Sequence, residues 1–256
     1  MRTVTALVAS LLFMSYGEHS EWLNIKKPGY TYFYQEPDRE RIQEYGALVD
    51  GGLQLVSLFF QQPFPKPFEV YVHPTRLSWD EKLRAAYQMP DFKSECWMVA
   101  SGDGFQLNMI SPITWDTAAC EHRYGDKVAT QSLITHELVH VFHGQHNPNP
   151  DFTAVEGIDW LVEGLATYAS GQLTADRLAG VETLVKENKT PTLLDNFWKG
   201  QHRYGLSGSV VKYIDQKYGR QKLLSLLAFT RKDQVLQALN LSEPQLLADW
   251  KNQFGH

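Results

Sequence analysis

Cysteine is scarce in this sequence of 256 residues, which contains only Cys96 and Cys120. Neither belongs to a Cys-x-x-Cys pair, so the sequence gives no support to dithiol redox catalysis or to a cysteine-rich metal knuckle. An even pair of cysteines in an exported protein is typical of one disulfide, and we expect these two to be bonded rather than buried as free thiols. Such a cross-link would stabilise the fold by about 3 kcal/mol.

A surplus of basic charge is also missing. The chain has 24 Lys and Arg against 29 Asp and Glu, a formal net charge of -5, so we expect no nucleic-acid partner. Hydrophobic residues make up 43% of the chain and charged residues 21%, which excludes an intrinsically disordered chain, a collagen-like repeat and a coiled coil. The length is sufficient for one sizeable core, or for two small lobes with a cleft between them.

Long hydrophobic runs are missing except near the start. Residues 4–14 are uncharged and mostly apolar, but this run is shorter than the roughly 20 residues that a transmembrane helix needs. Arg2 before it and the small residues Ser15 and Gly17 after it are typical of a cleaved signal peptide. We therefore expect residues 1–17 to be an export signal, and the remaining chain to be periplasmic or extracellular without stable membrane insertion. The alternative is an N-terminal core helix.

The first half of the chain has the patterns of strands. Four segments are β-branched, aromatic or alternating, namely residues 30–35, 68–73, 96–101 and 105–110. A Gly-Asp-Gly turn joins the last two segments into a predicted hairpin. Between the first two segments, Asp38 is a good N-cap for a long periodic run, which predicts a helix that ends at the prolines from Pro63 onward.

After Cys120 the pattern is helical almost without interruption. We expect helices at residues 128–144, 155–170 and 206–218, and two or three short helices between residues 221 and 254. Gly144 and Gly219 are placed as C-caps, and Ser242 is placed as a helix start. Because strands and helices segregate along the chain, the sequence predicts an α+β fold.

The segment with the clearest chemistry is His136-Glu137-Leu138-Val139-His140. Residues four apart lie on the same face of a helix, so both imidazoles project into the same space and can share one ion. Imidazole nitrogen is a ligand that zinc prefers, and Glu137 is placed to reach a water bound to the metal. The segment predicts a zinc site. Two histidines that are satisfied by ordinary hydrogen bonds are the alternative.

A catalytic zinc site needs a third protein ligand and an open fourth position. The chain offers His146, Glu163 and Asp159, and spacing alone does not separate Glu163 from the acids Asp159 and Glu156. Glu163 lies in an apolar helix, where a carboxylate is costly unless it is paired or bound to a metal. A solvated surface position is the simpler interpretation of Asp159 and Glu156.

His146 would match the metzincin pattern HExxHxxGxxH, but the sequence departs from that pattern at two points. The position that must be glycine, where the chain turns back, is His143, and Gly144 comes one residue late. No methionine follows Met109, so the methionine turn of that family is missing as well. We therefore reject His146 as the third ligand.

HELVH and the later segment WLVEGLATY (residues 160–168) together resemble the gluzincin zinc metallopeptidases, especially the peptidase MA-like group, in which a WxxEGxAxY helix follows the HExxH helix. The resemblance implies a single zincin-like catalytic domain over residues 18–256. Its N-terminal α/β lobe, to about residue 147, would contain a small, mostly antiparallel sheet. Its C-terminal lobe, from about residue 148, would be helical.

The resemblance also implies roles for individual residues. The zinc ligands that it implies are His136, His140 and Glu163. Glu137 would act as the general base that takes a proton from water. Tyr204 would stabilise the oxyanion, with His202 as a substitute and core packing as the alternative interpretation of Tyr204. Apart from the resemblance, each ligating histidine needs a partner that fixes its tautomer, and Thr167 and Asp159 are the two candidates, between which the sequence does not decide.

The expected function is the hydrolysis of peptide bonds in a peptide or protein substrate. Residues 105–110 precede the zinc-binding helix and are a candidate for the edge strand that pairs with an extended peptide, the alternative being an interior strand. Two other functions remain open. One is a zinc-binding module without proteolysis, and the other is a zinc hydrolase of a non-peptide amide.

Overall fold

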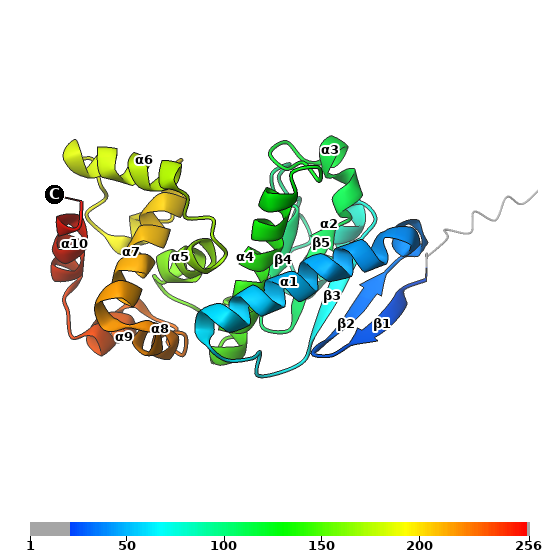
Figure 1. Cartoon of the computed structure of the whole chain (residues 1–256), viewed down its shortest axis with the longest axis horizontal. Coiled ribbons are helices and arrows are strands. Elements are labelled where there is room, and N and C mark those ends of the chain that lie inside the picture. The colour runs from blue at the N-terminus through cyan, green and yellow to red at the C-terminus, as the bar shows by residue number, and fades with distance from the viewer. Residues whose placement is uncertain (1–20, 255–256) are drawn as a thin grey trace, which may run out of the picture.

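The computed structural model describes residues 21–254, and within them a sheet-containing N-terminal half is followed by a helical C-terminal half (Figure 1). This confirms the α+β class. Helix α4 (Lys127–His146) is the last element of the first half, and the named elements that follow it are all helical. The expected export signal at residues 1–17 lies outside the described residues.

The sheet has five strands in the order β1-β2-β3-β5-β4. Their bounds are β1 Leu23–Lys27, β2 Tyr30–Tyr34, β3 Phe68–His73, β4 Ala100–Gly102 and β5 Gln106–Ile110. The outer pairs β1-β2 and β4-β5 are antiparallel, whereas β2-β3 and β3-β5 are parallel. The prediction of a mostly antiparallel sheet is therefore wrong. Helix α1 (Ile42–Phe60) is the crossover between the parallel strands β2 and β3, and between β3 and β5 the chain passes through α2 (Arg76–Tyr87) and returns along the antiparallel β4.

Strand β5 lies inside the sheet, between β3 and β4. The prediction that residues 105–110 form an edge strand is therefore wrong, and the interior strand is correct. Its residues 107–110 are all buried, as is typical of an interior strand. The edge is β4, which lies against α4 so closely that a Cβ on Gly102 would be 2.2 Å from the backbone oxygen of Glu137.

The remaining elements are helical, and their bounds are η1 Glu36–Arg41, η2 Pro112–Thr114, α3 Trp115–Ala118, α5 Asp159–Ala169, α6 Ala175–Lys186, η3 Leu194–Asn196, α7 Arg203–Tyr218, α8 Arg220–Leu226, α9 Lys232–Leu239 and α10 Glu243–Asn252. The predicted C-cap at Gly219 and the helix start at Ser242 are confirmed. The helix predicted at residues 155–170 begins only at Asp159, because Glu156 pairs with Arg231 in an isolated bridge and Gly157 has a positive φ of 66°.

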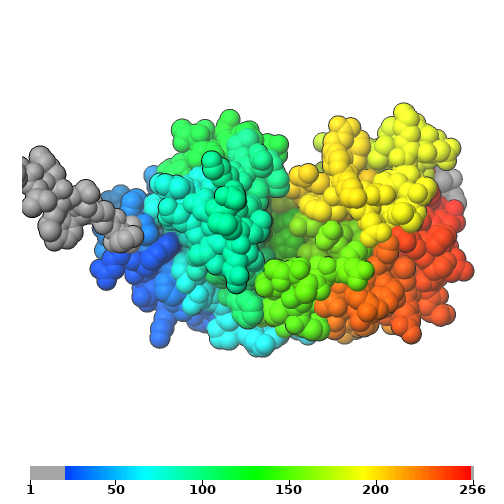
Figure 2. All heavy atoms as spheres, turned by 180° about the vertical axis from the view of Figure 1, so that it is seen from behind, coloured from blue at the N-terminus to red at the C-terminus, as the bar shows by residue number. Residues whose placement is uncertain are grey.

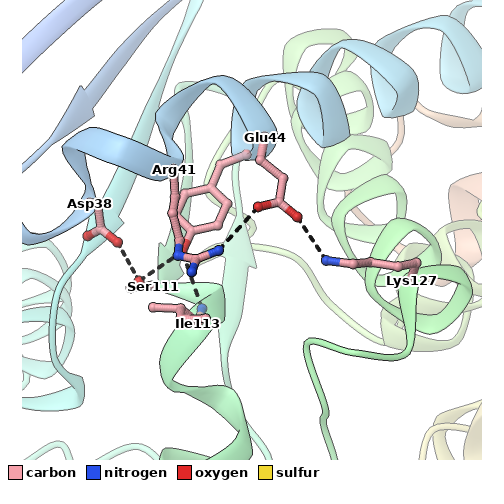
Figure 3. A network of polar contacts seen from close by, with 7 residues as sticks. Asp38, Arg41, Glu44, Ser111, Ile113 and Lys127 are labelled. Carbon is pink, nitrogen blue, oxygen red and sulfur yellow. Dashed lines mark hydrogen bonds and ion pairs between the residues drawn. The ribbon is translucent and has the colours of Figure 1, made fainter.

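A network of polar contacts joins the start of α1 to the start of α4 (Figure 3). Glu44 forms ion pairs with Arg41 at 3.5 Å and with Lys127 of α4 at 2.9 Å. The expected helix cap at Asp38 is wrong, because the N-cap of α1 is Arg41 and the buried Asp38 carboxylate instead accepts a hydrogen bond from the Ser111 hydroxyl. The ion pairs are partly exposed, so each contributes little to the free energy of unfolding.

Gly144 is not the helix C-cap that we expected, but a site of close backbone contact. It does not end α4, which continues to His146 with Asn147 as its C-cap. A Cβ on Gly144 would instead lie 2.5 Å from the backbone nitrogen of Gly104, which donates a hydrogen bond to the carbonyl oxygen of Pro150 at 2.9 Å. The close approach of the two glycines holds the turn between β4 and β5 against the end of α4.

The disulfide between Cys96 and Cys120 is confirmed, with a Cα–Cα distance of 5.4 Å. The Arg76 guanidinium also ties this region together, because it donates hydrogen bonds to the backbone oxygens of Cys96, Met98 and Ala118. The segment around Trp97 is therefore anchored from two sides. None of the helices within residues 21–254 is long and apolar enough to cross a membrane.

We predict that His73 makes the fold sensitive to acid. Burial lowers the pKa of His73 to about 4, against an ordinary value of 6.5. Between pH 4 and pH 6.5, His73 is therefore protonated in the unfolded chain and neutral in the folded chain. The stabilisation is complete above pH 6.5 and is lost as the pH falls toward 4. Between pH 7 and 5, the free energy of unfolding measured with urea should fall by about 1–2 kcal/mol more in the wild type than in His73→Gln. Equal slopes in the two proteins would contradict this account.

Candidate metal centre

Helix α4 carries His136, Glu137 and His140 into the interior. Its N-cap is Asp126, whose side chain accepts a hydrogen bond from the backbone nitrogen of Ala129. Apolar residues surround the motif, and the two imidazoles are each only 6% exposed. An imidazole pair buried in this way needs polar partners, because an unsatisfied polar group costs free energy in an apolar interior.

Helix α5 supplies the partner. Glu163 follows the buried Trp160, Leu161 and Val162, and its side chain retains 27% exposure. The neighbouring Gly164 brings α5 close to α7, because a Cβ there would lie 2.5 Å from the backbone oxygen of Ser207. Only a residue without a side chain allows the two helices to approach this closely.

The donor atoms of three side chains converge. Nε2 of His136 lies 3.4 Å from Oε2 of Glu163, and Nε2 of His140 lies 3.7 Å from the same oxygen. One ligand atom from each residue lies within 4.8 Å of the others. A tetrahedral ion bound at about 2.0–2.1 Å would place its ligand atoms about 3.3–3.4 Å apart. The two distances from Glu163 are close to this spacing, and the cluster of two imidazoles and one carboxylate can hold a metal ion.

The charges of His140 and Glu163 suit metal ligation, whereas His136 would have to release a proton when it binds a metal. Burial lowers the pKa of His140 to about 4, which keeps its ring neutral near pH 7. Burial acts in the same direction on His136, but the hydrogen bond to Glu163 and the charges of Glu137 and Glu163 outweigh it and raise the pKa of His136. Burial would raise the pKa of Glu163, yet the adjacent His140 and His136 lower it, which favours the carboxylate. A carboxylate and neutral imidazoles are the forms that bind metal.

Glu137 lies beside the cluster without joining it. Glu137 is only 8% exposed. Burial raises the pKa of its carboxyl to about 7; the charge of Glu163 raises this pKa further, and that of His136 lowers it. The edge strand β4 passes directly over its backbone, as the short distance from Gly102 shows. The group that sequence reasoning selected as the general base is therefore in an environment that allows it to hold or release a proton near neutral pH.

The other candidates for the third ligand are not part of the cluster. His146 lies at the end of α4, where Nδ1 is 2.8 Å from the backbone oxygen of Phe142 and Nε2 is 3.1 Å from the Gln62 amide nitrogen. Asp159 and Glu156 are exposed, in agreement with the simpler interpretation of both. Of the acids considered, only Glu163 meets the histidines.

Tyr204, in the first turn of α7, lies near the cluster, with its ring centroid 6.4 Å from that of His136. Burial raises the pKa of Tyr204, and the adjacent Arg203 opposes that rise, so the hydroxyl is protonated and able to donate near pH 7. His202 is paired with Gln201 and lies against Gly180 of α6. Tyr204 therefore remains the better-placed of the two candidates.

Among the described residues, neither Thr167 nor Asp159 makes the hydrogen bond that was expected to fix the tautomer of a ligating histidine. Among residues 21–254, Nδ1 of His136 is buried without a hydrogen-bond partner, and so is the Thr167 hydroxyl. Neither Thr167 nor Asp159 forms a hydrogen bond with a ligating histidine within this part of the chain.

Sequence reasoning missed four side chains around Tyr204. These are Trp97 from the first half of the chain, Arg177 of α6, and Trp198 and Arg203 from the entry to α7. Figure 2 shows the molecule hollowed between the teal part of the chain and the yellow part, with green atoms at the floor of the recess. Trp198 and Arg203 are near Tyr204 in the sequence, whereas Trp97 and Arg177 come from separate segments that the fold brings together.

No protein-family model matches the chain, and no curated protein matches it with significant similarity.

We predict that the three converging residues control metal content. Purified wild type loaded with zinc should bind about one ion per chain. His140→Ala and Glu163→Ala should each weaken binding by more than the roughly 10–100-fold that the loss of an outer-shell partner causes. The measurement is elemental analysis after dialysis against a graded zinc buffer.

Asp159→Ala is the matched control, because Asp159 is one helical turn from Glu163 and exposed. It should bind zinc as the wild type does. If Asp159→Ala loses the metal while Glu163→Ala keeps it, the ligand assignment is wrong.

Proposed function

We propose that this protein is a zinc metallopeptidase of the gluzincin type with a zincin-like catalytic domain. The observation that carries the proposal is the convergence of the two Nε2 atoms of HELVH on the carboxylate of Glu163, with Glu137 buried beside them. An HExxH helix followed by a ligating glutamate on the next long helix is the arrangement that the resemblance to gluzincins implied.

The chain's own residues divide the work. His136, His140 and Glu163 hold the ion, which when bound supplies positive charge that lowers the pKa of water from 15.7 toward about 7. Glu137 accepts the proton from the attacking water at its carboxylate and then donates it to the leaving amine. Tyr204 donates a hydrogen bond toward the carbonyl oxygen as charge develops there.

The position of β4 at an edge of the sheet supports a peptide substrate. Strand β4 pairs with β5 on one side only, within the described chain, and its Gly102 touches the backbone of Glu137. An extended peptide that added itself to this edge would run past the general base. A peptide or protein is therefore the proposed substrate, with β4 in the place that residues 105–110 were expected to take.

Export is part of the proposal. The disulfide between Cys96 and Cys120 is typical of an oxidising compartment, and residues 1–17 have the composition of an export signal. We propose that the enzyme acts in the periplasm or outside the cell.

We predict that Glu137→Gln separates binding from catalysis. The variant should keep about one zinc per chain, because Glu137 is not a ligand, and should lose about 10²–10⁴-fold in the rate of casein or peptide hydrolysis, because the base is missing. A chelator should abolish the wild-type activity. Glu156→Gln, which changes an exposed glutamate, is the control and should retain full activity.

Cleavage by Glu137→Gln at the wild-type rate would disprove the assignment of the base. A zinc-loaded wild type that hydrolyses no peptide bond in a broad peptide library would support the non-proteolytic alternative.

A further inference from the structure

Two arginines next to the metal cluster lack acidic partners. Among residues 21–254, neither Arg177 nor Arg203 forms an ion pair with a carboxylate, and Nε of Arg203 is buried without a hydrogen-bond partner. Two other half-buried cations have acidic partners, Arg220 with Asp215 at 2.7 Å and Lys232 with Glu243 at 3.2 Å, whereas the unpaired Arg76 is satisfied by backbone oxygens. An unpaired guanidinium that is partly withdrawn from water is costly, so its position calls for an explanation.

Aromatic rings hold Arg203 in place. Its guanidinium carbon lies 5.3 Å from the ring centroids of both Trp97 and Trp198, and 5.1 Å from that of Tyr204. Cation–π contacts of this kind orient the guanidinium without neutralising its charge. Apart from the donor that faces the Tyr204 hydroxyl, its N–H groups have no carboxylate partner within residues 21–254, and we take them as the donors for an anion.

Arg177 reaches the same tyrosine from α6. Its guanidinium carbon lies 4.5 Å from the Tyr204 ring centroid, and one of its N–H groups donates to the backbone oxygen of Gln172 at 2.6 Å. The Tyr204 ring also contacts His136, so this ring links both arginines to the metal ligands.

The balance of charge points to an anionic ligand. With a divalent ion in place, the carboxylates of Glu137 and Glu163 would offset its charge, and the two arginines would leave a positive surplus around Tyr204. Arginine binds carboxylates through paired, charge-assisted hydrogen bonds, which are stronger than neutral ones. An acidic substrate group would supply the partner that the chain itself does not.

We propose that Arg177 and Arg203 form a carboxylate-binding subsite beside the metal centre, so that the preferred substrate carries a carboxylate close to the scissile bond. The carboxylate is either an acidic side chain or the free C-terminus of the peptide. The description of the ligand as a substrate rests on the proposed peptidase function. The binding of the carboxylate can be tested without hydrolysis.

The test uses the zinc-loaded Glu137→Gln variant, in which peptides bind without being cleaved. Three matched peptides are titrated by calorimetry: acetyl-Ala-Gln-Ala-amide, acetyl-Ala-Glu-Ala-amide, and acetyl-Ala-Gln-Ala with a free C-terminus. At least one of the two anionic peptides should bind about tenfold or more tighter than the neutral one. Which of them does so identifies the source of the carboxylate.

Adding Arg177→Gln and Arg203→Gln should reduce this preference to less than about threefold, while the affinity for the neutral peptide and the zinc content stay unchanged. Arg231→Gln, which removes an exposed cation paired with Asp233, should keep the preference. If the double variant fails to fold, Arg177→Gln alone should still reduce the preference by about threefold or more, and Arg203→Lys should preserve part of it.

Equal affinity for all three peptides, or no binding of any, would overturn the subsite. A preference that survives the loss of both arginines would also overturn it, because the carboxylate would then be bound by the metal. Hydrolysis without a preference for anionic peptides would leave the peptidase standing and remove the subsite. If the wild type prefers anionic peptides but hydrolyses none, the carboxylate subsite stands and the proposed peptidase function is wrong.

Discussion

The contact of Glu163 with two imidazoles is the interaction on which the rest of the structure depends. It joins the last helix of the first half, α4, to the first helix of the second half, α5. The contacts between Glu163 and the two histidines offset part of the cost of withdrawing these polar groups from water. A divalent ion bound by all three would meet that requirement and would tie the two halves of the chain together.

Small residues make this meeting of helices possible. Gly164 allows α5 to approach α7, and the contact of Gly144 with Gly104 holds the hairpin turn against α4. The same packing places β4 over Glu137 and places Tyr204 next to His136. The unpaired arginines beside Tyr204 add positive charge that the metal ligands alone do not have.

Local signals predicted the parts of the structure that depend on nearby residues. The spacing of His136 and His140, the apolar setting of Glu163 and the pairing of the two cysteines were all readable in the sequence, and the structure agrees. Strand order was not readable, because it depends on which crossovers return the chain to the same end of the sheet.

Other features depend on contacts between distant segments. Asp38 resembles a helix cap, but its partner Ser111 is far along the chain. Trp97 meets Arg203 only through the fold, so no pattern in the sequence indicated a shared subsite. The α6 helix, which carries Arg177, was not predicted.

X-ray absorption spectroscopy at the zinc edge of the reconstituted wild type tests the central claim most directly. The account predicts four light-atom ligands at about 2.0–2.1 Å, of which two are imidazoles and none is sulfur. A chain that takes up no zinc, or a spectrum with fewer than two imidazole ligands, would contradict it.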